Sequence, residues 1–214
     1  MFRSPSSAIV VASALSACGG AQKAAGPPPC PVDPSITVAS QAELDAIATC
    51  VTMKRLTIRT GAELDLAPLA TLEKVEQLTI GPTLALDHIS LPALREVGEL
   101  VVQSNASVTG IFLPQLVTAR TIVAAGNSNA TTLSMPRLLR VGALRIEDNG
   151  SLEIIILSTL ATADTLGIVN NAVLATLELP ATAEVAHRAI EGNRALGELQ
   201  PSVDGSGSRG DHEF

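Results

Sequence analysis

Residues 91–105 read LPALREVGELVVQSN, and residues 113–127, which begin 22 positions later, read LPQLVTARTIVAAGN. Both stretches open on a leucine-proline pair, continue with aliphatic residues at alternating positions and close on an asparagine. Such alternation is typical of a β-strand with one buried face, and proline, glycine and asparagine between strands turn the chain. Each stretch therefore predicts one coil of a repetitive β-structure.

The 22-residue period extends far beyond these two coils, and it sets the predicted architecture. The apolar column that opens each coil contains Leu69, Leu91, Leu113, Met135, Leu157 and Leu179. A single coil buries too few aliphatic side chains to offset the entropy lost when its backbone is ordered, so the coils must stack. We therefore predict a mainly β solenoid of 22-residue coils with parallel strands over residues 35–199. The number of strands per coil stays open at this point.

A polar column keeps the same period. It contains Asn105, Asn127, Asn149, Asn171 and Asn193. Asparagine tolerates left-handed backbone conformations, and its side chain can bond neighbouring backbone groups where a coil turns. We expect these side chains to form a structural asparagine ladder, in preference to a ligand site or glycosylated positions.

The composition narrows the function classes. The chain has 214 residues, of which 46% are hydrophobic, but it has no Trp or Tyr and only three Phe. Leu, Ile, Val and Ala must therefore fill a thin, repetitive interior. The net charge of −7 at pH 7 disfavours nucleic acid as a partner.

The N-terminal residues predict export. Residues 1–17 have the parts of a signal peptide: a basic residue, an apolar stretch too short to span a bilayer, and small residues before a cleavage site. Residues 15–18 read LSAC and resemble the lipobox of bacterial lipoproteins, which implies lipidation of Cys18. Gly19 stands where lipoproteins retained at the inner membrane typically carry aspartate, so the resemblance points to the outer membrane. Residues 18–34, rich in Pro, Gly and Ala, predict an extended tether.

Two cysteines remain once Cys18 is assigned to lipid. In an oxidising envelope compartment Cys30 and Cys50 are expected to form a disulfide across the first coil. Two unpaired, buried thiols are the alternative.

The two ends of the solenoid differ in sequence. Ser40 and Glu43 have the spacing of a capping box, and Leu44, Ile47 and Ala48 fall on one helical face. Residues 40–50 therefore predict a short helix that covers the N-terminal coil. Residues 200–214 predict a disordered polar tail, and the RGD triplet at 209–211 is expected there by chance.

Three stretches resemble the receptor L-domain family, a relative of leucine-rich repeats. Residues 50–58 read CVTMKRLTI, residues 97–105 read VGELVVQSN, and residues 141–149 read VGALRIEDN. The resemblance covers about residues 36–199 and implies a right-handed parallel β-helix from a family of ligand-binding ectodomains. Gly61 and Thr83 depart from the asparagine column, and Arg188 departs from an apolar column, as suits the end coils of a solenoid.

The residues expected to point outward from the main strands form a polar surface with charges of both signs. The candidate binding face comprises Arg55, Thr57, Arg59, Gln77, Thr79, Glu99, Gln103, Arg145 and Glu147. No catalytic cluster, metal-ligand spacing or phosphate-binding glycine loop is recognisable, so we expect no enzyme, metal or cofactor. Asp87 and His88 are adjacent, which we interpret as a chance surface pair.

Three hypotheses of function follow. The first is a membrane-anchored surface lipoprotein, monomeric, that binds a protein or glycan through its strand face, with Phe112 and Ile156 in the same contact patch. The second is a passive structural envelope protein without a specific ligand. The third and weakest is a polysaccharide-active β-helix enzyme.

Overall fold

The computed structural model describes residues 30–31 and 35–197. It is a parallel β-solenoid of about seven turns with a spacing of about 22 residues, as the sequence predicts. The signal peptide, Cys18 with most of the tether, and the tail after Gly197 lie outside the described residues.

Two parallel sheets form the walls of the solenoid. The eight-stranded sheet has the order β1 (Ser35–Val38), β2 (Thr52–Glu63), β3 (Lys74–Ala85), β5 (Glu96–Gln103), β7 (Thr118–Ala125), β9 (Arg140–Glu147), β11 (Thr162–Val169) and β13 (Glu184–Glu191). The five-stranded sheet contains β4 (His88–Ser90), β6 (Gly110–Phe112), β8 (Thr132–Ser134), β10 (Ile154–Ile156) and β12 (Thr176–Glu178). A regular coil thus has two strands, which answers the question that the sequence left open.

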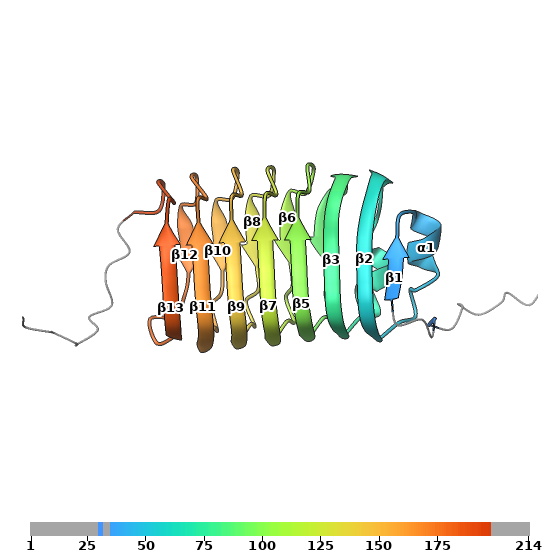
Figure 1. Ribbon diagram of the computed structural model, residues 1–214, viewed down its shortest axis with the longest axis horizontal. Helices are drawn as coiled ribbons and strands as arrows, with labels where there is room; N and C mark the ends of the chain where they lie inside the picture. The colour runs from blue at the N-terminus through green and yellow to red at the C-terminus, as the bar shows by residue number, and fades with distance from the viewer. Residues whose placement is uncertain (1–29, 32–34, 198–214) are drawn as a thin grey trace, which may run out of the picture.

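The coils stack in register. Thr121 of β7 pairs with Ala143 of β9, and Ala143 pairs with Thr165 of β11, so the partners lie 22 residues apart. Each coil rises along the eight-stranded sheet in front and returns through the five-stranded sheet behind, while successive coils advance from helix α1 (Gln41–Asp45) towards β13 (Figure 1). This path is right-handed, the sense favoured for parallel crossover connections.

The space between the sheets is filled by stacked aliphatic columns. One column consists of Leu56, Leu78, Leu100, Ile122, Leu144 and Leu166, each at most 2% exposed. Their neighbours in sequence point outward because side chains alternate along a strand. The predicted alternation therefore decides which residues form the core and which form the surface.

The asparagine ladder is present and almost entirely buried. Each ladder side chain donates through Nδ2 to a backbone carbonyl 25 residues earlier, as Asn149 does to Ala124 O (3.0 Å). The first four also donate to the Oδ1 of the asparagine in the next coil, as Asn127 Nδ2 does to Asn149 Oδ1 (3.1 Å). In the second coil Thr83 takes the asparagine position, and its hydroxyl donates to Asn105 Oδ1 (2.8 Å).

The prediction that the ladder asparagines themselves adopt a left-handed backbone is wrong by one position. Positive φ falls on the residue before each ladder asparagine: Ser104, Gly126, Asp148, Asn170 and Gly192. The ladder residues are therefore selected for their side-chain hydrogen bonds, while the preceding residue makes the turn.

The N-terminal end is capped. Helix α1 (Gln41–Asp45) begins at Ser40, whose hydroxyl accepts from Glu43 N (3.4 Å), while Glu43 Oε2 accepts from Ser40 N (3.1 Å). The capping box is confirmed, although the helix ends at Asp45 and the chain continues in turns towards Cys50. Strand β1 pairs with β2 and was not expected as a separate strand.

A disulfide joins Cys30 to Cys50, with their Cα atoms 4.9 Å apart, and confirms the expected pairing. It ties the first described residues to the start of β2.

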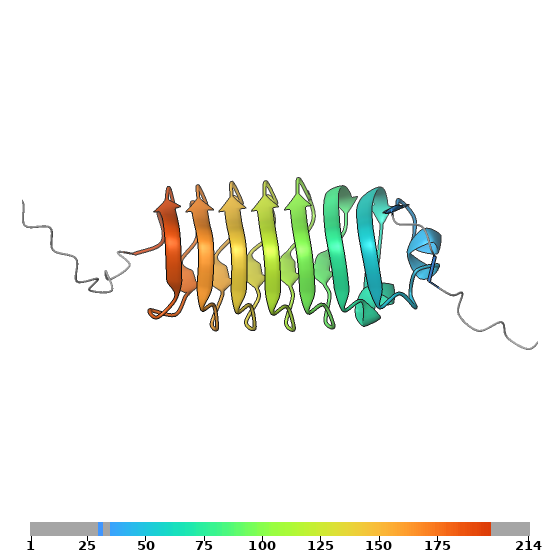
Figure 2. The same cartoon turned by 60° about the horizontal axis from the view of Figure 1, so that its bottom comes forward.

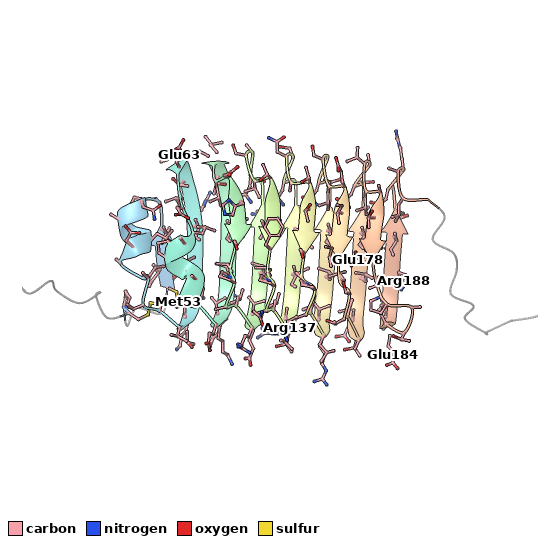
Figure 3. All side chains as sticks on the ribbon, turned by 180° about the vertical axis from the view of Figure 1, so that it is seen from behind. Met53, Glu63, Arg137, Glu178, Glu184 and Arg188 are labelled. Carbon is pink, nitrogen blue, oxygen red and sulfur yellow. A yellow bond between two sulfur atoms is a disulfide. The ribbon has the colours of Figure 1, made fainter. Side chains whose placement is uncertain are left out.

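The C-terminal coil is more open. Leu177, Val185 and Ile190 are only partly buried, and Arg188 takes the place that Leu166 holds in the preceding coil. Glu178, Glu184 and Arg188 all lie at this end of the molecule (Figure 3).

Candidate functional site

The candidate binding face lies on the outer side of the eight-stranded sheet. Its residues come from four strands: Arg55, Thr57 and Arg59 from β2, Gln77 and Thr79 from β3, Glu99 and Gln103 from β5, and Arg145 and Glu147 from β9. Each is exposed or half-buried. Within residues 35–197 no helix or loop covers this row of strands (Figure 2).

Three side chains form a hydrogen-bonded row across the N-terminal strands. Arg55 Nε donates to Gln77 Oε1 (2.7 Å), and Gln77 Nε2 donates to Glu99 Oε2 (3.2 Å). The row runs along one register position of β2, β3 and β5. Its cation and anion are therefore both engaged before any ligand arrives.

A second polar pair occupies β9. Arg145 Nε donates to Glu147 Oε1 (2.7 Å), and this hydrogen bond, followed by the charge of Glu147, raises the pKa of Arg145 above its ordinary value. Four strand steps separate β9 from β2, a distance of about 19 Å. Arg145 therefore does not form one basic cluster with Arg55 and Arg59.

Between the two polar groups the face is made of short side chains. Val101 of β5, Thr121 and Val123 of β7, and Ala143 of β9 are half-buried neighbours on adjacent strands. We call these four residues the central platform. Strand alternation makes them outward-facing, and their position between Glu99 and Arg145 makes them a flat, weakly polar area.

Phe112 and Ile156 lie on the five-stranded sheet, in β6 and β10. This sheet forms the opposite wall of the solenoid, so the expectation that they join the strand face in one contact patch is wrong. The 22-residue register alone could not reveal this, because it does not say how many strands a coil contains.

A shallow groove of about 330 Å³ lies at the bend where β3, β5 and β7 begin. Its walls include Glu76, Gly98 and Arg120, and Lys74 Nζ lies 2.6 Å from Glu96 Oε2 beside it. Hydrogen bonding to Glu96, with a further contribution from its charge, raises the pKa of Lys74. The groove is bordered by charges of both signs.

The structure brings no catalytic arrangement together at the residues singled out. Asp87 Oδ2 and His88 Nδ1 are 3.6 Å apart, and both side chains are largely exposed. Among the described residues no three His, Cys, Asp or Glu side chains are grouped as metal ligands would be. The ladder residues Asn105, Asn127, Asn149 and Asn171 are at most 1% exposed, so a ligand outside the solenoid cannot reach them.

Comparisons with known proteins add no assignment. No protein-family model matches the chain, and no curated protein or solved structure is found to be similar to it. Across residues 30–31 and 35–197, no helix has the length and apolar character needed to cross a membrane.

Proposed function

We propose that this protein is a non-catalytic, lipid-anchored recognition or adhesion module of the bacterial cell envelope. The outer face of its eight-stranded sheet would contact a protein or another surface ligand. The observation that carries the proposal is the central platform, an uncovered area of short side chains between two polar groups that are already paired. A flat partner surface can approach such an area without displacing long side chains or breaking ion pairs.

The N-terminal sequence supports the proposed location. A lipobox-like LSAC ending at Cys18, followed by glycine and a proline-rich tether, is what an anchored outer-membrane protein requires. The Cys30–Cys50 disulfide is consistent with an oxidising compartment. The resemblance of the repeats to receptor L-domains adds a family in which such coils present ligand-binding surfaces.

The passive structural role remains a second candidate because of one observation. Two of the three arginines of the face, Arg55 and Arg145, are satisfied within the molecule. Large aromatic and unpaired arginine side chains, which dominate most interface energetics, are absent from the central platform.

A site-specific photocrosslinker separates these two functions. It would be placed at Val123 in the central platform and, as the matched control, at Ile154 on the opposite sheet of the same solenoid. Recognition predicts a discrete adduct from Val123 in intact cells, lost when Ala143→Arg places a long cation in the platform. Absence of any adduct at Val123 would favour the passive role.

Anchoring is tested separately by Cys18→Ser. The proposal predicts that this variant is released from the membrane fraction, whereas Cys50→Ser, which removes another cysteine, stays with it. Unchanged membrane fractionation of Cys18→Ser would contradict the lipid anchor.

A further inference from the structure

A second surface, on the five-stranded sheet, has features that the proposed recognition face lacks. The five-stranded sheet stops at β4, because the preceding coil has the 3₁₀ helix η1 (Ala67–Thr71) where the next strand would stand. Pro68 at the start of η1 cannot donate to a strand ladder, which explains the substitution. A hollow of about 250 Å³ lies between η1 and β4, with Asp65, Leu66, His88 and Ser90 in its walls.

Phe112 lies on β6, the strand that pairs with β4 on the side away from η1. Strand β6 pairs with β4 so that Phe112 is opposite Ser90 and Gly110 is opposite His88. A Cβ atom placed on Gly110 would lie 2.5 Å from Phe112 Cε2 and 2.6 Å from Cζ, so the ring rests over the glycine. Phe112 is the only aromatic residue among those described, yet 38% of it is exposed on the face of the sheet.

Polar groups surround the ring without having protein partners. Across the part of the chain that the structure describes, the hydroxyls of Ser90, Thr132 and Ser134 make no hydrogen bond. Ser90 and Ser134 flank Phe112 on the two neighbouring strands, and Thr132 lies beside Gly110. The carboxylate of Asp65 is held in place because its Oδ1 accepts from Ala67 N (2.9 Å), and this leaves Oδ2 available.

We propose that the hollow between η1 and β4, together with the Phe112 ring, binds one pyranose ring of a glycan. A pyranose has an apolar face of C–H groups that packs on an exposed aromatic ring and an edge of hydroxyls that can both donate and accept. Asp65 would accept from such hydroxyls, and Ser90 and His88 would exchange hydrogen bonds with them. The site goes beyond the proposed recognition face and shares none of its residues.

Other ligand classes fit this site less well. An apolar peptide side chain would bury Asp65, Ser90 and His88 without partners, which is unfavourable. A phosphate or carboxylate ligand would be repelled by Asp65 and by Asp87, the neighbour of His88. A neutral polyhydroxylated ring avoids both costs.

Saturation-transfer difference NMR on the full chain tests the proposal with methyl β-glucoside, methyl β-galactoside and N-acetylglucosamine as probes. A shallow site for one sugar predicts a Kd on the order of 1–10 mM for at least one probe. Phe112→Ala and Gly110→Ala should each weaken that binding about tenfold. Gly110→Ala keeps the aromatic ring and changes only its position.

Matched controls separate binding from folding. Ile156→Ala shortens an apolar side chain on the same sheet, two strands away from β6, and should leave sugar binding unchanged. Circular dichroism would show that each variant is folded. Ser90→Ala, which removes one hydroxyl, should also weaken sugar binding and so tests the site independently. Lack of saturation transfer to every probe, or undiminished binding in Phe112→Ala or Gly110→Ala, would overturn the proposal. Neither result bears on crosslinking at Val123.

Discussion

At the scale of single residues, the asparagine ladder constrains the sequence most, because each side chain makes several hydrogen bonds. Asn149 Oδ1 accepts from both Asn127 N (3.0 Å) and Asn127 Nδ2 (3.1 Å), while Asn149 Nδ2 donates to Asn171 Oδ1 (3.1 Å). Each side chain thus satisfies backbone and side-chain groups of its neighbouring coils at once. From Asn105 to Asn171 each side-chain amide also donates to the Oδ1 of the next ladder asparagine, so these four hydrogen bonds run in one direction and polarise one another.

Replacing one ladder residue should therefore be costly. Asn149→Ala leaves the buried backbone N–H of Asn127 without its acceptor and removes the amide that donates to Ala124 O, while Asn127 Nδ2 keeps Val102 O as an acceptor. We expect a loss of about 3 kcal/mol in the free energy of unfolding. Urea denaturation followed by circular dichroism measures this loss. Asn129→Ala, an exposed asparagine that donates only to Ala106 O, should cost less than about 1 kcal/mol. Equal effects of the two variants would show that the ladder is not structural.

The inward-facing columns and the ladder could be predicted from the sequence because their residue types repeat at a fixed spacing. The turn position could not. Positive φ is carried by serine, glycine, aspartate and asparagine in different coils, so that column has no constant residue type. The ladder asparagine next to it is the same in each of these coils, so the left-handed backbone was predicted at the asparagine, one position after the residue that adopts it.

Among the elements, α1 depends on charge at its first turn. Glu43 accepts from Ala39 N (2.8 Å) and Ser40 N (3.1 Å). The hydrogen bond with Ala39 first, then that with the Ser40 side chain, and last that with the Ser40 backbone, lower the pKa of Glu43 below its ordinary value of 4.5. A carboxyl whose pKa is lower in the folded chain stabilises the fold above its unfolded pKa. That contribution is lost as the pH falls through the folded pKa.

The capping box should therefore make stability depend on pH in the acidic range. We expect Glu43→Gln to be less stable than the parent chain at about pH 7 and the difference to shrink towards about pH 3. Urea denaturation at both pH values measures this. Glu153→Gln, at an exposed glutamate whose side chain makes no hydrogen bond among the described residues, is the control and should show no such pattern. A difference for Glu43→Gln that is constant with pH would contradict the capping role.

The five-stranded sheet could not be predicted from the sequence because its strands are too short. Its strands have three residues, so each contributes one inward side chain, such as Ile89 in β4 or Ile111 in β6. One buried residue shows no alternation. The hollow beside η1 was beyond prediction for the same reason, since it exists only because one coil has a 3₁₀ helix where others have a short strand.

At the scale of the whole molecule, the two ends are protected in different ways. Helix α1 and strand β1 cover the N-terminal coil. At the other end, within the described part of the chain, β13 pairs with β11 on one side only, and Arg188 occupies the inward column. A charge in the inward column of an edge strand discourages another sheet from adding to it.

Removing that charge should promote association. Arg188→Leu completes the apolar column at the open end, and we expect concentration-dependent oligomers in sedimentation velocity, whereas the parent chain stays monomeric. Arg194→Leu removes an exposed arginine near the same end but outside β13, and it should remain monomeric. If Arg188→Leu stays monomeric at its highest soluble concentration, Arg188 does not protect this end.

Both proposed binding surfaces depend on one claim: each further 22 residues adds one coil, and so advances the sheet by one strand spacing. Pulsed electron spin resonance measures the distance between two spin labels, at Thr57 and Arg145 in one sample and at Thr57 and Ala189 in a second. Both samples carry Cys18→Ser and keep the disulfide intact. These positions share one register column. The account predicts backbone separations of about 19 and 29 Å, an increase of about 10 Å for two further coils. Separations that do not grow with the number of coils would contradict the solenoid and both proposed binding surfaces.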